Sequence, residues 1–311
     1  MTIASIDIGS NTILLLICQS IKQENPINTI TNFYESPRLS EKIKFGDKLS
    51  QDKINSLISV LSSYKQQIEK FNCEKVLIVG TNVFRMISNS NEVIHEIKKL
   101  FGWNIKILTG DEEARLTFLG SIFPIQDSSL INVIDIGGGS TEFIHGEPSK
   151  IHYKKSFNIG VVSLTEKFFR NYLPIEAEII NALEYSKNIF SELAGNYNGD
   201  YDTIAVAGTP TTLSCIKQNI RFYDEVKVEN SILHLSDVET LIGELINLSK
   251  GQVLQRYGQV VRGREDVLLA GCLILVSVMK LLNIYRVRVS TKGLRYGVVV
   301  NFLINNSLLN F

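Results

Sequence analysis

Residues 134–141 read IDIGGGST, and residues 6–12 carry a shorter version of the same pattern, IDIGSNT. Each copy has an apolar run with one aspartate, Asp135 or Asp7, and then a glycine turn that ends in hydroxyl side chains. Two apolar runs joined by a short Gly- and Asn-containing turn predict a β-hairpin. Because the pattern occurs once in each half of the chain, we expect two similar lobes that arose by internal duplication.

Helical and strand-like segments follow each hairpin. In the first half, apolar residues recur at helical spacing from Ile54 to Phe71, and KVLIVGT (75–81) predicts a strand. Asp111 is predicted to cap the helix EEARLTFLGS that follows it. In the second half the predicted strands are TIAVAGT (203–209) and YRVRVST (285–291), and GLRYGVVVNFLI (293–304) predicts a closing helix.

The predicted fold is therefore α/β with two lobes. We expect a first lobe over residues 1–120 and a second lobe over residues 121–295. The closing helix, over about residues 296–311, is expected to pack back on the first lobe.

Composition excludes several functional classes. The 311 residues, 44% of them hydrophobic, suffice for two buried cores. The 32 basic residues balance 32 acidic ones, which argues against a nucleic-acid or anionic-membrane partner. Four scattered cysteines without a CxxC pair indicate reduced thiols, and the N-terminus does not read as a signal peptide. We therefore expect a cytoplasmic protein.

The two glycine turns have the composition of a phosphate-binding site. Glycine allows backbone N–H groups to converge on an anion, and an aspartate at the entrance is placed to hold hydrated Mg²⁺. One such turn is usually an ordinary hairpin turn, but two copies in matched contexts favour phosphate binding. No G-x-G-x-x-G leads directly into a helix and no Walker A sequence occurs, which argues against those nucleotide sites.

A series of further segments carries a family resemblance. In chain order they are VGTNVFR (79–85), GDEEARLTFLG (110–120), NIGVVSLTEKF (158–168), VAGTPTTL (206–213), GREDVLLAGCLIL (263–275) and STKGLRYGV (290–298). Together with the two glycine turns they resemble the exopolyphosphatase/guanosine pentaphosphatase (Ppx/GppA) family of the actin-like ATPase superfamily. The resemblance implies two ribonuclease H-like lobes with a cleft between them. Long members carry a further helical domain, and a chain that stops at Phe311 is expected to be a short two-domain form.

The resemblance also implies catalytic roles. Glu113 matches the family's catalytic glutamate and would orient a water molecule and take its proton. Without the resemblance, Glu113 reads equally well as a solvated acid on a helix, which is what we expect of Glu112. Arg85 would clamp phosphate oxygens bidentately.

The remaining site residues are expected to bind phosphate or metal. The predicted phosphate contacts are Gly9, Ser10, Asn11, Thr12, Arg38, Gly137, Gly138, Gly139, Ser140, Gly208, Thr209, Arg264 and Arg295. The predicted ligands of Mg²⁺, or of another divalent cation, are Asp7, Asp135 and Glu142. Arg38 reads equally well as an ordinary loop arginine. Tyr296 replaces the acid that the family usually has after Arg295.

We therefore expect an exopolyphosphatase that releases orthophosphate from the end of inorganic polyphosphate by metal-assisted hydrolysis. The alternative within the family is hydrolysis of guanosine pentaphosphate (pppGpp), which would use the same catalytic residues. Less favoured alternatives are an ATP-dependent kinase of the superfold and a sensor that binds polyphosphate or alarmone without turnover. Homodimers are common in the family, although no feature of this sequence identifies an interface.

Overall fold

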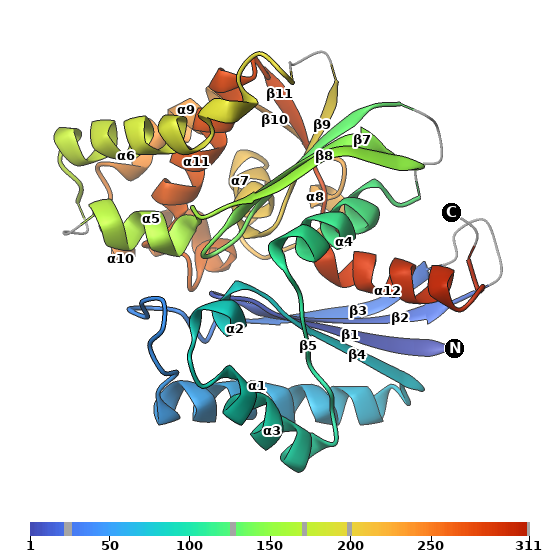
Figure 1. Cartoon of the computed structure of the whole chain (residues 1–311). Coiled ribbons are helices and arrows are strands. Elements are labelled where there is room, and N and C mark those ends of the chain that lie inside the picture. The colour runs from blue at the N-terminus through green and yellow to red at the C-terminus, as the bar shows by residue number, and fades with distance from the viewer. Residues whose placement is uncertain (22–26, 125–128, 170–172, 198–200, 310–311) are drawn as a thin grey trace. The chain divides into compact units, whose positions relative to one another are not determined.

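The structure is a computed structural model that describes residues 1–21, 27–124, 129–169, 173–197 and 201–309 (Figure 1). The chain forms two compact units, Met1–Gln126 with Lys292–Phe311, and Asp127–Thr291. The first unit extends beyond the predicted limit of residue 120 because helix α4 (Gly110–Ile122) continues to Ile122, which is fully buried.

The first unit contains a five-stranded sheet in the order β3-β2-β1-β4-β5. Strands β1 (Thr2–Ile8), β2 (Ile13–Ser20) and β3 (Ile27–Glu35) are antiparallel neighbours, whereas β4 (Lys75–Gly80) and β5 (Lys106–Ile107) run parallel to β1 and β4. Its helices are α1 (Gln51–Lys70), α2 (Asn82–Met86), α3 (Ser90–Phe101), α4 and α12 (Leu294–Asn305).

Helices cover both faces of this sheet, with α1 and α3 on one side and α4 and α12 on the other (Figure 1). Successive strand residues point to opposite faces, so β1 serves both cores. Ile3 packs in a cluster with Tyr296 and Val299 of α12. Ile6 packs in a second cluster with Leu57 of α1. The closing helix is therefore an integral layer of the first unit.

The second unit contains a six-stranded sheet in the order β10-β11-β9-β6-β7-β8. The strands are β6 (Ile131–Ile136), β7 (Thr141–Glu147), β8 (Lys150–Phe157), β9 (Asp202–Val206), β10 (Ile232–His234) and β11 (Arg286–Val289). The helices are α5 (Val161–Phe168), α6 (Glu176–Ile189), α7 (Gly208–Lys217), α8 (Glu225–Val228), α9 (Leu235–Leu245), α10 (Lys250–Tyr257) and α11 (Leu268–Leu281).

The two sheets share one plan. In each, three antiparallel strands (β1 to β3, or β6 to β8) are extended by parallel strands (β4 and β5, or β9 and β11) beside the first strand of the hairpin. The predicted fold of two similar α/β lobes is confirmed. No helix in the described part of the chain is long and apolar enough to span a bilayer.

Candidate functional site

The two glycine turns close in the same way. The N–H of Gly9 donates to the carbonyl of Thr12 at 3.0 Å, and the N–H of Gly137 donates to the carbonyl of Ser140 at 2.9 Å. Each turn consists of four residues, because Ile8 pairs with Ile13 and Ile136 pairs with Thr141. All eight predicted turn residues thus lie in equivalent tight turns between antiparallel strands.

The first turn holds polar atoms that no described residue satisfies. Ser10 and Asn11 are buried, and neither Ser10 Oγ nor Asn11 Oδ1 has a hydrogen-bond partner among the described residues. Leaving a buried polar atom unpaired costs about 1–3 kcal/mol. Such atoms favour a site that a polar ligand completes.

The Arg38 loop is attached directly to this turn. The N–H of Arg38 donates to the carbonyl of Asn11 at 3.1 Å, and the N–H of Ser40 donates to the carbonyl of Ser10 at 3.0 Å. Arg38 has φ 51°, a left-handed conformation that costs a residue with a side chain about 1–3 kcal/mol. The structure therefore places the backbone of Arg38 beside the first turn in a strained conformation, and phosphate binding by Arg38 stays a prediction.

The second turn is supported by helix α5. The N–H groups of Val161 and Val162 donate to the carbonyls of Gly137 and Gly138 at 2.9 and 2.8 Å. A Cβ atom at Gly160 would lie 2.5 Å from the Gly138 carbonyl oxygen, so only glycine allows this approach. The helix fixes the carbonyl side of the turn.

Two acidic residues of the second unit face each other across neighbouring strands. Asp135 of β6 pairs in register with Glu142 of β7, and both side chains are buried. Ser156 of β8 donates to Glu142 Oε1 at 2.5 Å. Paired carboxylates repel one another when both are charged, and a divalent cation relieves that repulsion. The donor set therefore fits Mg²⁺.

Asp7 has a different environment in the first unit. Its cross-strand partner is Leu14, which occupies the position that Glu142 has in the second unit. Within the described residues, no group of three or more His, Cys, Asp and Glu side chains is arranged to hold a metal. A cation on the Asp135 and Glu142 pair would also take water or substrate oxygens as ligands, which is usual for Mg²⁺.

Glu113 lies in the first turn of α4 and is paired with Arg85. Arg85 Nη1 donates to Glu113 Oε2 at 2.8 Å and to the carbonyl of Leu108, also at 2.8 Å. Burial raises the pKa of Glu113, while the charge and hydrogen bond of Arg85 oppose this shift. The net direction is upward, towards the range in which a carboxylate acts as a general base.

The start of α4 differs from the prediction. Thr109 is the N-cap, since its side chain accepts from the N–H of Glu112 at 3.1 Å and its own N–H donates to the Glu112 carboxylate at 3.0 Å. Lys106 also pairs with Glu112 at 2.8 Å and lowers the pKa of that carboxyl. The prediction that Asp111 caps the helix is wrong, whereas Glu112 is a partly exposed acid on the helix surface, as expected, and also completes the capping box. The extended backbone of Thr109, not that of Asp111, precedes the first helical turn.

The turn before α7 holds Arg264 against the backbone. Arg264 Nη1 donates to the carbonyl of Gly208 at 2.5 Å and to Thr212 Oγ1 at 3.1 Å. Thr209 packs against Gly271 of α11, where a Cβ atom would overlap it. These contacts give Arg264 and Thr209 a structural part in shaping the turn, and phosphate binding by these residues and Gly208 stays a prediction.

The closing helix carries Arg295 and Tyr296. The Arg295 guanidinium lies 5.6 Å from the centroid of the Tyr296 ring. Tyr296 is buried, and its hydroxyl lies 2.9 Å from Thr29 Oγ1 on β3. A buried tyrosine that fastens α12 to the sheet accounts for the residue found in place of an acid. Phosphate binding by Arg295 remains a prediction.

Sequence reasoning missed Lys53, which contacts the loop that carries Arg38. Lys53 Nζ donates to the carbonyl oxygens of Pro37 and Arg38 at 3.3 and 2.6 Å. Lys53 occupies the first turn of α1, where the helix dipole favours acidic residues. A lysine in that position is the signal that could have pointed to it.

Several known proteins of different lengths are similar in sequence to this chain. A bifunctional 3-dehydroquinate synthase/phosphatase of Fusobacterium nucleatum is 31% identical over 291 residues, which are 89% of this chain and 43% of the relative. A guanosine-5'-triphosphate,3'-diphosphate pyrophosphatase of Aeromonas salmonicida is 26% identical and is matched over 97% of this chain and 60% of the relative. A Haemophilus influenzae protein whose name proposes an exopolyphosphatase is 26% identical, with 96% and 90% covered. The chain thus spans about half the length of the first two relatives.

A solved structure and a family profile cover nearly the whole chain. The Aquifex aeolicus PPX-GPPA enzyme superposes with a TM-score of 0.81 at 30% identity, over 97% of this chain and 99% of that one. The sequence profile of the Ppx/GppA phosphatase family matches residues 17–306. Because this profile covers most of the chain, the chain belongs to the Ppx/GppA phosphatase family.

Proposed function

We propose that this protein hydrolyses the terminal phosphoanhydride bond of inorganic polyphosphate and releases orthophosphate. The observation that carries the proposal is the buried Glu113 carboxylate, which Arg85 holds at 2.8 Å on the first turn of α4. Family membership and the exopolyphosphatase name of the H. influenzae relative support the same reaction class.

In the proposed step, Glu113 accepts a proton from a water molecule aligned behind the terminal phosphorus. The water oxygen forms a bond to phosphorus while the bridging P–O bond breaks, and the shortened chain leaves with the electron pair. Arg85 and the backbone amides of the glycine turns stabilise the charge on the phosphate oxygens. No covalent intermediate with the protein is required.

A divalent cation, which we propose to be Mg²⁺, neutralises phosphate charge when bound. Asp135 and Glu142 would hold it, because they are adjacent buried carboxylates in register. Asp7 is proposed as a further ligand, direct or through water. Ser156 would orient Glu142 through its 2.5 Å hydrogen bond.

A second candidate substrate is guanosine pentaphosphate. The Aeromonas salmonicida relative is named for the cleavage of this nucleotide, and the same base would serve both reactions. We also propose that the protein acts in the cytoplasm, since its four cysteines are free thiols as in reducing compartments.

Phosphate release from polyphosphate and from guanosine pentaphosphate, measured with Mg²⁺, tests the proposal. Glu113→Gln keeps the shape of the side chain but removes the base, and we expect activity to fall by about 10²–10⁴-fold. Glu112→Gln is the matched control, because glutamine preserves a capping box. If only guanosine pentaphosphate is cleaved, it and not polyphosphate is the substrate. Equal activity of Glu113→Gln and wild type would refute the role of Glu113.

A further inference from the structure

The loop that presents Arg38 is held by a lysine from another element. Lys53 projects from the first turn of α1, and its ammonium donates to two consecutive carbonyl oxygens, those of Pro37 and Arg38. It also lies 3.6 Å from Glu41 Oε2. A cation at a helix N-terminus is electrostatically unfavourable, so these three oxygen contacts are what compensate it there.

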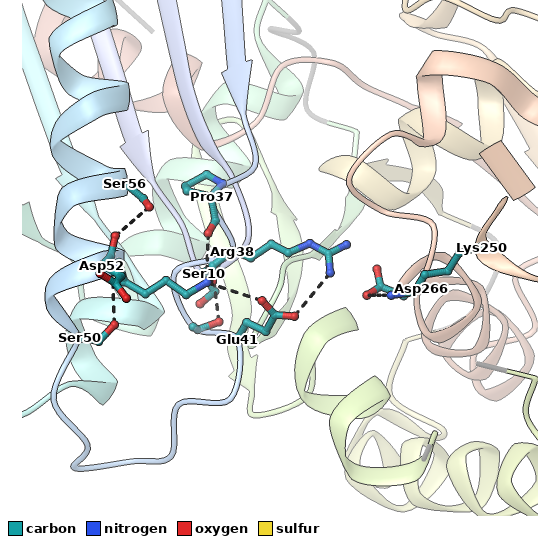
Figure 2. A network of polar contacts seen from close by, with 11 residues as sticks. Ser10, Pro37, Arg38, Glu41, Ser50, Asp52, Ser56, Lys250 and Asp266 are labelled. Carbon is teal, nitrogen blue, oxygen red and sulfur yellow. Dashed lines mark hydrogen bonds and ion pairs between the residues drawn. The ribbon is translucent and has the colours of Figure 1, made fainter. Parts of the chain in front are cut away.

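The same carboxylate also faces Arg38. Arg38 Nη1 lies 3.8 Å from Glu41 Oε1, and Figure 2 shows Glu41 reaching towards the Arg38 guanidinium. At this distance the ion pair is loose, and both side chains are partly exposed, so phosphate oxygens can displace the carboxylate at little cost. Phosphate forms stronger, bidentate bonds with arginine than a single remote carboxylate oxygen does.

The backbone of the loop requires such support. Arg38 and Lys42 both have positive φ values, 51° and 61°. The loop is anchored on one side by the Ser10 and Asn11 carbonyls of the first glycine turn and by the buried side chain of Leu39. On the other side, the Lys53 side chain donates to the carbonyls of Pro37 and the strained Arg38.

We propose that Lys53 is a positioning residue that sets the direction of the Arg38 guanidinium, and that Glu41 competes with substrate phosphate for that guanidinium. The inference rests on the proposed function, because it takes Arg38 to bind the phosphate chain of the substrate. The two neighbours of Arg38 then act in opposite directions, since Lys53 promotes phosphate binding and Glu41 restrains it.

Steady-state hydrolysis of polyphosphate by variants of Lys53, Glu41 and Arg38 tests the inference. We expect Lys53→Met to raise KM about tenfold with kcat nearly unchanged, and Lys53→Arg to restore part of the loss. Glu41→Gln should lower KM. Adding Lys53→Met to Arg38→Met should cause no further loss, because Lys53 acts through Arg38. Lys65→Met, which removes an exposed lysine of the same helix paired with Glu69 at 4.0 Å, is the matched control.

Two measurements separate this inference from the proposed function. Hydrogen exchange of the Ser40 and Ile43 amides should be faster in Lys53→Met than in wild type, whatever the substrate is. If the wild type hydrolyses no polyphosphate, the proposed function fails. The inference is then tested by comparing the affinities of the same variants for tripolyphosphate, measured by calorimetry, in place of their KM values. Three results would overturn the inference. The first is unchanged hydrogen exchange in Lys53→Met. The others are a shift of KM or affinity in the same direction in Glu41→Gln and Lys53→Met, or additive losses in the double variant.

Discussion

Arg85 and Glu113 are 28 residues apart in the chain, yet the Arg85 guanidinium donates to the Glu113 carboxylate at 2.8 Å within the first unit. Arg85 comes from α2, which follows β4, and Glu113 comes from α4, which follows β5. Neighbouring parallel strands β4 and β5 end at the same sheet edge, and this brings the two helix starts together. The pair gives the proposed base a charge partner that controls when it is ionised.

This pairing predicts how activity depends on pH. Burial raises the pKa of Glu113 and Arg85 opposes the rise, so Arg85→Met should raise the pKa further. A general base acts when deprotonated, so the acidic limb of kcat/KM should move to higher pH in this variant and return towards wild type in Arg85→Lys. Arg115→Met, which removes an Asn301 contact elsewhere on α4, should leave the limb in place. A limb that stays put or moves to lower pH in Arg85→Met would contradict the pairing.

The buried carboxylates of Asp135 and Glu142 predict that Mg²⁺ binding depends on Glu142. Glu142→Gln should weaken Mg²⁺ binding about tenfold or more, and Ser156→Ala should weaken it less, because the serine only orients the ligand. Calorimetric titration with Mg²⁺ measures this without turnover. Glu147→Gln, on the same strand but outside the pair, is the control. Equal Mg²⁺ affinity in Glu142→Gln and wild type would remove Glu142 from the ligand set.

The contact between α4 and α12 predicts a stability loss on adding one methyl group. Gly297 of α12 lies against the backbone of Leu116, where a Cβ atom would overlap the carbonyl oxygen. Gly297→Ala should lower the free energy of unfolding by about 1–3 kcal/mol, because the helices must separate. A Cβ atom at Gly243 of α9 would meet no other atom within 4 Å, so Gly243→Ala should instead stabilise the protein by about 0.5–1 kcal/mol. Urea denaturation measures both, and a stabilising Gly297→Ala would refute the close contact.

The capping box of α4 predicts a difference between two neighbouring residues. Thr109→Ala should destabilise the protein by about 1 kcal/mol, since it leaves the Glu112 N–H without its cap. Asp111→Ala should cost less, because this exposed residue does not cap the helix. Thermal unfolding of both variants decides between them. A larger loss of stability in Asp111→Ala than in Thr109→Ala would support the sequence-based prediction that Asp111 is the N-cap.

Local sequence patterns predicted the two lobes well, whereas contacts between residues far apart in the chain could not be predicted from such patterns. The hairpins of Asp7 and Asp135 were predictable because an apolar run, a glycine turn and a second apolar run lie within about 15 residues. The capping box was a local feature as well, but Thr109 and Asp111 are both capping residue types, and backbone geometry decides between them.

The arrangement of the candidate site was less accessible. The sequence offered Arg85 as a clamp for phosphate, and its pairing with Glu113 depends on the order of strands β4 and β5. Arg264 reads as a phosphate contact from its charge, yet its bonds to Gly208 and Thr212 depend on a turn 52 to 56 residues away. Charge indicates what a side chain can bind, and topology determines which partner it finds.

The first unit is assembled from two separate segments of the chain, and this bears on the order in which the two units fold. Tyr296, Val299 and Val300 of α12 complete the cluster around Ile3, so one side of that core stays uncovered until α12 has been synthesised. The inserted second unit contains its entire sheet and core within Asp127–Thr291 and can fold earlier on the ribosome. We therefore expect the first unit to complete its folding after the second, and we expect its uncovered apolar sheet face to be the part of the nascent chain that a chaperone binds.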